Sequence, residues 1–302
     1  MAETWLQAAL DCPHDAVAAA EATFEAEGAL VTWTEGAGDE EILEPGPGAT
    51  PLWASVRLTA LLPPDTDRAR LAAAFPGREL RFSVVADRDW DAEWRRGLKP
   101  LRFGQRLWVC PVGQACPDPA GVGVLLEPGL AFGTGTHPTT AMCLAWLDGL
   151  ATAGVLAGAR LLDYGCGSGI LAIAALALGA SAATGVDIDP QALIATRDNA
   201  ARNGCGERLR CGLPDELPAG EPPVDVLVAN ILSGPLVRLA PVLRHFARPG
   251  TRVALSGILA GQATEVADAF RPWVSLALAG RMDGSGADQW VLLAGEVGGA
   301  RA

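Results

Sequence analysis

Residues 160–189 read RLLDYGCGSGILAIAALALGASAATGVDID, and this stretch determines the fold class. It begins with a short apolar run, after which three glycines follow at alternate positions: Gly165, Gly167 and Gly169. An uninterrupted apolar segment comes next, and a second apolar run ends on Asp187. The order predicts a strand, a glycine turn, a helix and a second strand with an acid at its tip.

This arrangement suits a cofactor that contains a ribose. Glycine lets the backbone approach a ligand closely and adopt positive φ, and the helix offers free N–H groups at its N-terminus. An acid on the neighbouring strand can accept both ribose hydroxyls. Three interpretations stay open here: glycines used only for packing, a dinucleotide-binding fold and a methyltransferase. A dinucleotide fold needs its third glycine one residue later than Gly169, whereas the spacing D-x-G-x-G-x-G resembles motif I of S-adenosylmethionine-dependent methyltransferases.

The composition narrows the classes of partner. The chain has 302 residues, enough for one large and one small domain, and a formal net charge of −12. Such an acidic chain is poorly suited to unaided nucleic-acid binding and better suited to a basic partner. Its seven cysteines lack zinc-ligand spacing and its three histidines lie far apart, so we expect reduced thiols, no metal and a cytoplasmic location. We expect neither a signal peptide nor a membrane span.

The first third of the chain has a pattern of its own. Strands are predicted over residues 3–10, 29–34, 53–61 and 79–85, and helices over residues 14–27 and 65–75. Asp65 is the expected N-cap of the second helix. The order β-α-β-β-α-β predicts a small ferredoxin-like domain over residues 1–86. It contains no catalytic constellation, so we interpret it as a recognition or packing module.

A connecting helix is predicted over residues 87–100, before a second domain over residues 101–302. Trp90 and Trp94 lie four apart on one face of this helix. Tryptophans at that spacing usually pack in a core, and contact with a ligand is the alternative.

Residues 126–147 read LEPGLAFGTGTHPTTAMCLAWL and predict a glycine- and threonine-rich loop that leads into a helix. Pro138 suits the first turn of that helix. The loop is either a plain linker or a segment that folds over a ligand, and we favour the ligand. We expect His137 to be a surface or capping histidine rather than a general base.

A buried parallel strand is predicted over residues 224–229, VDVLVA, and Asn230 follows it directly. Ligands of this fold class lie at the carboxyl ends of strands. The amide oxygen of an asparagine placed there can hold an amine, and a simple turn asparagine is the alternative.

With these motifs in place, the chain resembles the bacterial ribosomal protein L-eleven methyltransferases. The connecting helix, with its paired tryptophans and the Lys-Pro that follows, carries part of the likeness. Five further segments carry the rest: GLAFGTGTHPTT (129–140), DYGCGSGILAIAA (163–175), DIDP (187–190), NIL (230–232) and SGIL (256–259). The glycine motif alone would place the chain only among class I methyltransferases, whereas its combination with the first, third and fourth segments is much more specific. The match runs by motif from about residue 87 to the C-terminus, and by layout only before that.

The resemblance implies a Rossmann-like, doubly wound class I methyltransferase sheet behind a small α+β ferredoxin-like domain. It implies an enzyme that transfers methyl groups from S-adenosyl-L-methionine to the N-terminal amine and lysine side chains of ribosomal protein L-eleven, which the first domain grips. It also implies a set of cofactor contacts, among which Asn230 lies near the transferred methyl and is the catalytic residue: Thr140, Gly165, Gly167, Asp187 and Asn230.

Two other functions stay open. A class I enzyme acting on another protein or on nucleic acid is the main alternative. However, base-modifying relatives carry an N-P-P-Y-type motif where residues 230–233 read NILS. A cofactor-binding interaction protein without catalysis is the second alternative, and the intact motifs argue against it.

Overall fold

The computed structural model describes residues 4–37, 55–86, 99–127, 137–216, 222–283 and 289–298. The chain divides into two compact units, residues 1–97 and 98–302. Most of the predicted connecting helix, with both of its tryptophans, lies outside the described residues, and so do residues 128–136 of the predicted loop.

The first unit is a four-stranded antiparallel sheet packed against two helices. Its elements are β1 (Thr4–Pro13), a 3₁₀ turn (His14–Ala16), α1 (Val17–Ala26), β2 (Val31–Gly36), β3 (Ser55–Leu62), α2 (Arg68–Ala73) and β4 (Arg81–Ala86). The strand order β2-β3-β1-β4 is that of a ferredoxin-like sandwich, as the β-α-β-β-α-β pattern predicted.

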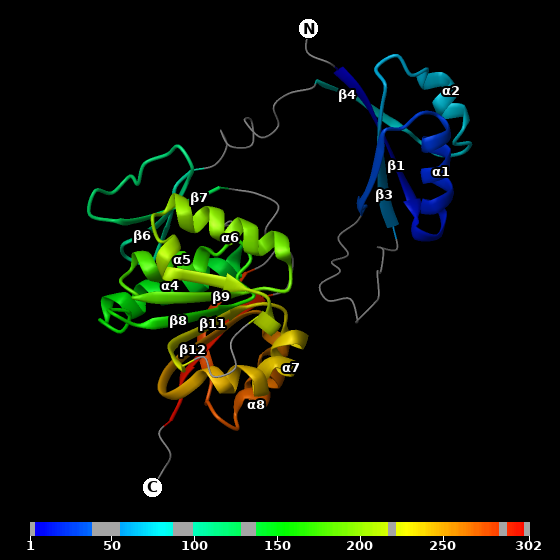
Figure 1. The fold of residues 1–302 in the computed structure, drawn as a ribbon. Helices are drawn as coiled ribbons and strands as arrows, with labels where there is room; N and C mark the ends of the chain where they lie inside the picture. The colour runs from blue at the N-terminus through cyan, green and yellow to red at the C-terminus, as the bar shows by residue number, and fades with distance from the viewer. Residues whose placement is uncertain are drawn as a thin grey trace. The chain divides into compact units, whose positions relative to one another are not determined.

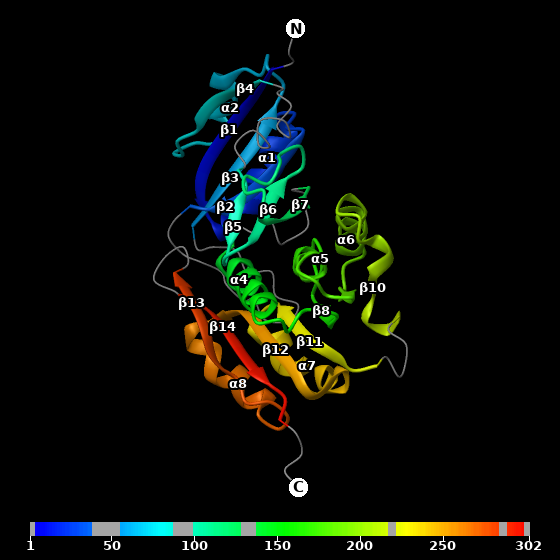
Figure 2. The same cartoon turned by 90° about the vertical axis from the view of Figure 1, so that its left-hand side faces the viewer.

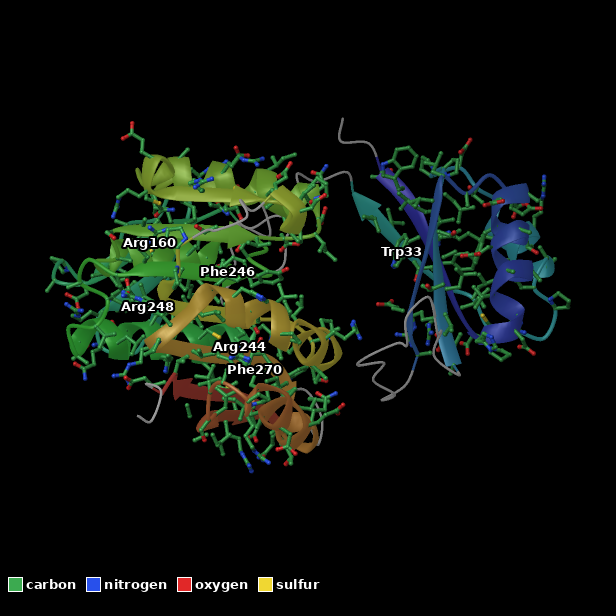
Figure 3. The ribbon with its side chains drawn as sticks, turned by 60° about the horizontal axis from the view of Figure 1, so that its bottom comes forward. Trp33, Arg160, Arg244, Phe246, Arg248 and Phe270 are labelled. Atoms are coloured by element: carbon green, nitrogen blue, oxygen red, sulfur yellow. The ribbon has the colours of Figure 1, made fainter. Side chains whose placement is uncertain are left out.

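Alternate residues of β1 and β3 face the two helices and form the core of this unit. The largest fully buried side chains there include Phe24, Leu58 and Leu71. Trp33 of β2, labelled in Figure 3, is 40% exposed. Its register partner, Thr59, alternates with the core residues of β3, so both belong to the face turned away from the core.

One detail of the first unit was predicted wrongly. The N-cap of α2 is Asp67 rather than Asp65, and its carboxylate accepts hydrogen bonds from the N–H groups of Ala69 (2.9 Å) and Arg70 (3.2 Å). Asp65 lies instead in a turn that is closed by the Thr66 N–H and the Pro63 carbonyl (3.1 Å), so the helix begins later.

The second unit contains a seven-stranded sheet of order β10-β9-β8-β11-β12-β14-β13. Its strands are β8 (Arg160–Tyr164), β9 (Ala182–Val186), β10 (Leu209–Gly212), β11 (Val224–Asn230), β12 (Ala247–Leu259), β13 (Ala277–Asp283) and β14 (Gln289–Glu296). Only β14 runs against its neighbours in this sheet. Figure 2 shows β10 and β13 at opposite sides of the sheet. The strand order reverses between β8 and β11, which is where ligands bind in doubly wound folds.

Helices cover both faces of this sheet (Figure 1), with α4, α5 and α6 on one side and α7 and α8 on the other. Their bounds are α4 (Pro138–Thr152), α5 (Ile170–Ala177), α6 (Pro190–Arg202), α7 (Ser233–Leu243) and α8 (Ala263–Phe270). Short 3₁₀ turns lie at Gly206–Arg208, Pro214–Glu216, Arg244–Phe246 and Ala260–Gln262. A helix that is apolar all round must be buried, and residues 170–176 of α5 are indeed all buried. Within the described residues, no helix is long and apolar enough to cross a membrane.

A separate three-stranded sheet packs against α4 and α5. It consists of β5 (Leu101–Phe103), β6 (Leu107–Pro111) and β7 (Val122–Leu126). We did not predict β5, which is too short to show a periodic pattern. Apolar patterns over residues 274–278 and 289–293 predict a final antiparallel pair, and β13 and β14 form that pair, but β13 begins three residues later than expected. Val274 instead closes a turn on the Phe270 carbonyl (3.0 Å) and packs in the core.

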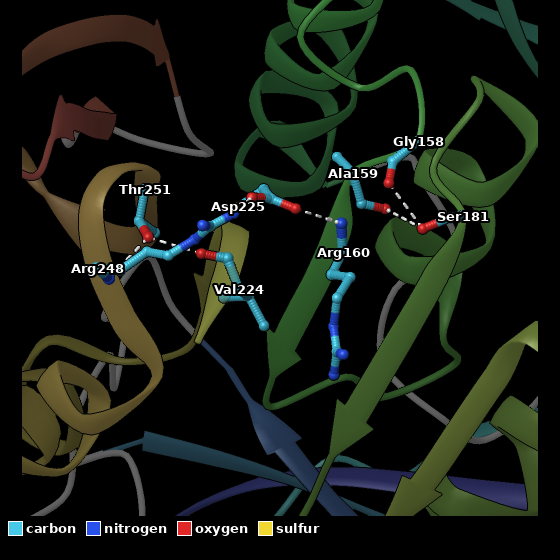
Figure 4. Close-up of polar contacts among 8 residues, drawn as sticks. All are labelled: Gly158, Ala159, Arg160, Ser181, Val224, Asp225, Arg248 and Thr251. Carbon is cyan, nitrogen blue, oxygen red and sulfur yellow. Dashed lines mark hydrogen bonds and ion pairs between the residues drawn. The ribbon is translucent and has the colours of Figure 1, made fainter. Parts of the chain in front are cut away.

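Figure 4 shows how the amino ends of the central strands are tied together. Asp225 accepts the Arg160 N–H (2.9 Å) and forms an ion pair with Arg248. The Thr251 hydroxyl donates to the Val224 carbonyl (2.6 Å). Figure 3 shows Arg160 and Arg248 at this edge, on the ribbon of the second unit. These contacts join the amino ends of β8, β11 and β12 to one another.

Candidate functional site

A cavity of about 510 Å³ opens at the carboxyl ends of β8, β9 and β11. This volume falls within the range of roughly 300–1,000 Å³ that is usual for small-molecule sites. Its lining is mostly apolar and consists of His137, Thr139, Tyr164, Gly165, Gly167, Asp187, Ile188, Asn230, Ile231, Leu232, Pro235, Leu239, Gly257 and Trp290. Four of the five predicted cofactor contacts therefore line one cavity at the switch point of the sheet.

The turn between β8 and α5 forms part of the cavity wall and requires glycine. Gly165 and Gly167 adopt φ values of +82° and +53°, in the left-handed region that side chains rarely enter. A Cβ added to Gly165 would lie 2.2 Å from the Cγ2 atom of Ile231. The turn and the segment after β11 are therefore in direct contact, and a side chain at Gly165 would push them apart.

Asp187 lies at the tip of β9, beside this turn. Its Oδ2 atom accepts the Gly167 N–H (2.8 Å), and its Oδ1 atom accepts the Asp189 N–H (3.0 Å). A carboxylate has about four lone-pair positions, so each oxygen keeps capacity for a ligand hydroxyl. The neighbouring Ile188 is 82% exposed and offers an apolar surface to the same cavity.

Asn230 lies at the end of β11, and its side chain is held by Thr140 of α4. The Nδ2 group donates to the Thr140 hydroxyl oxygen at 3.2 Å. This contact turns the Oδ1 atom away from Thr140, and Oδ1 is buried with no hydrogen-bond partner among the described residues. Thr140 is fully buried and does not line the cavity. Its contact with a cofactor stays a prediction, whereas its contact with Asn230 is observed.

His137 caps the N-terminus of α4, which is one of the two roles predicted for it. Its Nδ1 atom lies 2.7 Å from the Thr139 hydroxyl and accepts the Thr139 N–H at 3.4 Å. Burial lowers the pKa of the imidazole and so favours the neutral ring, in which an accepting Nδ1 atom leaves the proton on Nε2. The ring also meets Trp290 edge to face, with 5.1 Å between the ring centroids. A ring committed to the cap in this way is poorly suited to be a general base.

Comparisons with known proteins place this site in a family. A sequence model described as "Ribosomal protein L11 methyltransferase (PrmA)" matches residues 4–295. A ribosomal protein L11 methyltransferase of Azotobacter vinelandii is 50% identical over 298 residues, covering 96% of this chain and 98% of the relative. One of Pseudomonas paraeruginosa is 52% identical over 274 residues, covering 88% of this chain and 91% of the relative. The chain belongs to the ribosomal protein L11 methyltransferase family.

A solved structure agrees with this assignment. The crystal structure of a ribosomal protein L11 methylase from Lactobacillus delbrueckii subsp. bulgaricus superposes with a TM-score of 0.56 at 28% identity, covering 67% of this chain and all of that chain. This chain is thus an S-adenosylmethionine-dependent methyltransferase with a class I sheet and a small N-terminal antiparallel sheet.

The cavity fits the cofactor that this family uses. Two glycines leave their part of the cavity wall free of side chains, Asp187 keeps lone pairs for hydroxyls, and Ile188 offers an exposed apolar surface. Asn230 lines the same cavity, and its Oδ1 atom is buried with no hydrogen-bond partner among the described residues. Among the described residues, no group of three or more histidine, cysteine, aspartate or glutamate side chains is arranged to hold a metal ion.

Several lining residues were not predicted from the sequence. Trp290 and Leu239 carry no local signal, because they reach the cavity only through the packing of β14 and α7. Ile188 did carry one, since an apolar residue between two acids at a strand tip is unusual on a solvated surface.

Asp163, two residues before the turn, is fully buried inside the family's glycine motif. Burial raises its pKa to about 7, against a partial lowering by the Ala172 N–H, which donates to Oδ2 at 3.2 Å. The Oδ1 atom has no hydrogen-bond partner among the described residues. The folded protein therefore binds this proton more tightly than the unfolded chain does.

This shift predicts how stability depends on pH. Between about pH 4 and pH 7 the unfolded chain releases the Asp163 proton while the folded protein keeps it, so this group makes the protein less stable as the pH rises. The Asp163→Asn variant keeps an oxygen for the Ala172 N–H and cannot ionise. We expect it to gain stability over the parent on the order of 3 kcal/mol at pH 8 and much less at pH 4. Chemical denaturation of the cofactor-free proteins from pH 4 to pH 8 measures this, and a constant difference would contradict it.

Proposed function

We propose that this enzyme methylates the N-terminal amine and lysine side chains of ribosomal protein L11. The relatives' names supply the protein substrate, and the unpartnered amide oxygen of Asn230, a residue that lines the cavity, supports an amine as the target. An uncharged amine that presents its lone pair to a methyl group still carries N–H bonds, and these need an acceptor. The Oδ1 atom of Asn230, buried and without a partner among the described residues, is such an acceptor.

The proposed roles of the predicted site residues follow from their positions. Asp187 would hold the ribose hydroxyls, and Gly165 and Gly167 would let the backbone lie close to the amino acid part of the cofactor. Ile188 would pack against the planar adenine base of the cofactor. Asn230 would orient the amine, and Thr140 would keep the Asn230 amide in the rotamer that points Oδ1 away from α4.

When bound, S-adenosylmethionine supplies an electrophilic methyl group. The protein's part is to orient the amine and to favour its uncharged form. Aliphatic lining residues such as Ile231, Leu232 and Leu239 raise the free energy of an ammonium group and so lower the pKa of an entering lysine. Fixed groups that hold the amine in line with the methyl group lower the entropic cost of bringing the two reactants together. No covalent intermediate is needed.

A labelling experiment tests the substrate. The enzyme is incubated with tritiated S-adenosylmethionine and, in separate reactions, with ribosomal protein L11, the remaining ribosomal proteins or total RNA. We expect label on L11 alone, and mass spectrometry of its peptides should place it on the N-terminal amine and lysines. Label on RNA, or on another protein in preference to L11, would overturn the proposal.

We further propose that residues 1–86 recognise the substrate and that residues 101–302 carry out catalysis. The first unit has its own core, and all described residues that line the cavity belong to the second unit. A chain that begins at Leu98 should therefore bind S-adenosylhomocysteine normally but methylate L11 far more slowly. Methylation of L11 at the parent rate would contradict the recognition role, and loss of cofactor binding by a folded chain would contradict the division of labour.

We also propose a cytoplasmic location. All seven cysteines have free thiols, and five of them are buried. Unpaired thiols are typical of proteins in a reducing compartment. Fractionation of the source cells, with the protein detected by antibody, tests this, and recovery outside the cytoplasm would contradict it.

A further inference from the structure

Three polar side chains lie at helical spacing on the inner face of α6: Thr196 and Asn199 within the helix and Asn203 at its C-cap. Thr196 and Asn199 are 0% and 1% exposed. Threonine and asparagine are poor helix formers, and burying their polar groups costs free energy unless those groups are hydrogen-bonded. Their presence in the middle of a helix therefore needs an explanation in what they bind.

The first two of these side chains hold the glycine turn. The Thr196 hydroxyl donates to the Gly167 carbonyl (2.9 Å), and the Asn199 Nδ2 group donates to the next carbonyl, that of Ser168 (3.0 Å). With Asp187 accepting the Gly167 N–H (2.8 Å) from the other side, the turn is fixed by three side-chain hydrogen bonds within two residues.

The packing of α6 on the turn is also close. A Cβ added to Gly169 would lie 2.9 Å from the Cγ2 atom and 3.2 Å from the Cα atom of Thr196. The third glycine of the motif is therefore required by α6, whereas the first is required by Ile231. The position of α6 sets the path of the turn.

Asn199 reaches a second segment as well. Its Oδ1 atom accepts the N–H of Glu127 (3.2 Å), the residue that follows β7. One turn further along, at the C-cap of α6, Asn203 binds both the N–H (2.8 Å) and the carbonyl (2.7 Å) of Leu125, and it also donates to the Asn199 carbonyl (2.8 Å). Asn203 therefore forms hydrogen bonds to β7 and none to the glycine turn, whereas Asn199 forms hydrogen bonds both to the residue after β7 and to that turn.

We propose that Thr196 and Asn199 are positioning residues for S-adenosylmethionine, which set the backbone of residues 167–168 at the distance that the cofactor requires. The proposal rests on the proposed location of the cofactor at the glycine turn. Neither side chain lines the cavity, so each acts through the turn.

Substitutions at Thr196 separate the hydroxyl from the volume of the side chain. Thr196→Val keeps the shape but loses the bond to Gly167, and Thr196→Ser keeps the bond but loses the methyl group near Gly169. We expect Thr196→Val to weaken binding of S-adenosylhomocysteine, measured by calorimetry, by about tenfold, because one buried carbonyl loses its donor. The Thr196→Ser variant should stay within about threefold of the parent enzyme, since its hydroxyl restores that bond.

Substitutions on the same face of α6 provide the matched control. Asn199→Ala should also weaken S-adenosylhomocysteine binding by about tenfold and raise the KM for S-adenosylmethionine more than it lowers kcat. Asn203→Ala removes two hydrogen bonds to β7 and one to the Asn199 carbonyl, so it should lower the melting temperature at least as much, yet leave the Kd within about twofold. Equal effects of Asn199→Ala and Asn203→Ala on Kd, or no effect of Thr196→Val, would overturn the proposal.

The outcomes also distinguish this inference from the proposed function. Asp187→Ala is measured in parallel. If it leaves the Kd for S-adenosylhomocysteine unchanged, the location of the cofactor is wrong and the inference fails with it. If Asp187→Ala weakens binding but Thr196→Val and Asn199→Ala do not, only the inference fails. If all three weaken binding and L11 is not methylated, the inference stands and the substrate is wrong.

Discussion

Replacing Asp187 by alanine is expected to weaken the binding of S-adenosylhomocysteine by at least tenfold, and by about a hundredfold if both ribose hydroxyls are lost. Each hydrogen bond to a charged group contributes roughly 1.5–3 kcal/mol. The structure adds a second cause, because Asp187 also accepts the Gly167 N–H and so holds the glycine turn (2.8 Å). Isothermal calorimetry of the purified variant measures the effect.

Asp189 provides the control for this substitution. It lies two residues away, is exposed, and caps α6 by accepting the Gln191 N–H (2.9 Å). The Asp189→Ala variant should lose stability of about 1 kcal/mol, as is usual for a lost N-cap, with little change in cofactor affinity. An Asp187→Ala variant that keeps its fold and the parent affinity would show that Asp187 does not hold the cofactor.

Replacing Asn230 by alanine is expected to lower kcat by about a hundredfold or more, the usual effect of removing one polar group preorganised at a reacting centre. Binding of S-adenosylhomocysteine should change much less. The reason is that the Oδ1 atom, buried and without a partner among the described residues, is assigned to the amine rather than to the cofactor. Steady-state kinetics with L11 and calorimetry with S-adenosylhomocysteine separate the two effects.

Two further variants sharpen the test of Asn230. Thr140→Val removes the contact that fixes the amide, so it should lower turnover by less than Asn230→Ala does. Ser256→Ala is the control: Ser256 is the register partner of Asn230 on β12, is buried, and donates to the Val291 carbonyl (3.0 Å) without lining the cavity. It should lower stability and spare turnover. An Asn230→Ala variant with normal kcat and weakened cofactor binding would make Asn230 a binding residue.

Local sequence was sufficient to predict a feature wherever the pattern and the residues that carry its chemistry lie on one short segment. The glycine spacing after β8, the acid at the tip of β9 and the asparagine at the end of β11 are all readable in order along the chain. Since the carboxyl ends of parallel strands meet at one edge of a sheet, Asp187 and Asn230 were expected near the glycine turn, and both line the same cavity as that turn. The start of α4 at Pro138 and its cap by His137 were predictable for the same reason.

Tertiary structure decided the contacts between segments that are distant in sequence. The partner of Asn230 is Thr140, 90 residues earlier, and Trp290 joins the cavity only because β14 inserts between β12 and β13. The hydrogen bonds from α6 to the glycine turn could not be predicted either, since Thr196 and Asn199 have the pattern of ordinary polar residues of an amphipathic helix. Periodicity shows which face of a helix or strand is buried, but not which atoms of other elements pack against that face. A buried polar group obtains its partner only when separate elements pack together. For this reason the sequence by itself determined the fold class of this protein and the residues at its strand ends. The packing of the elements determined the hydrogen bonds that position those residues.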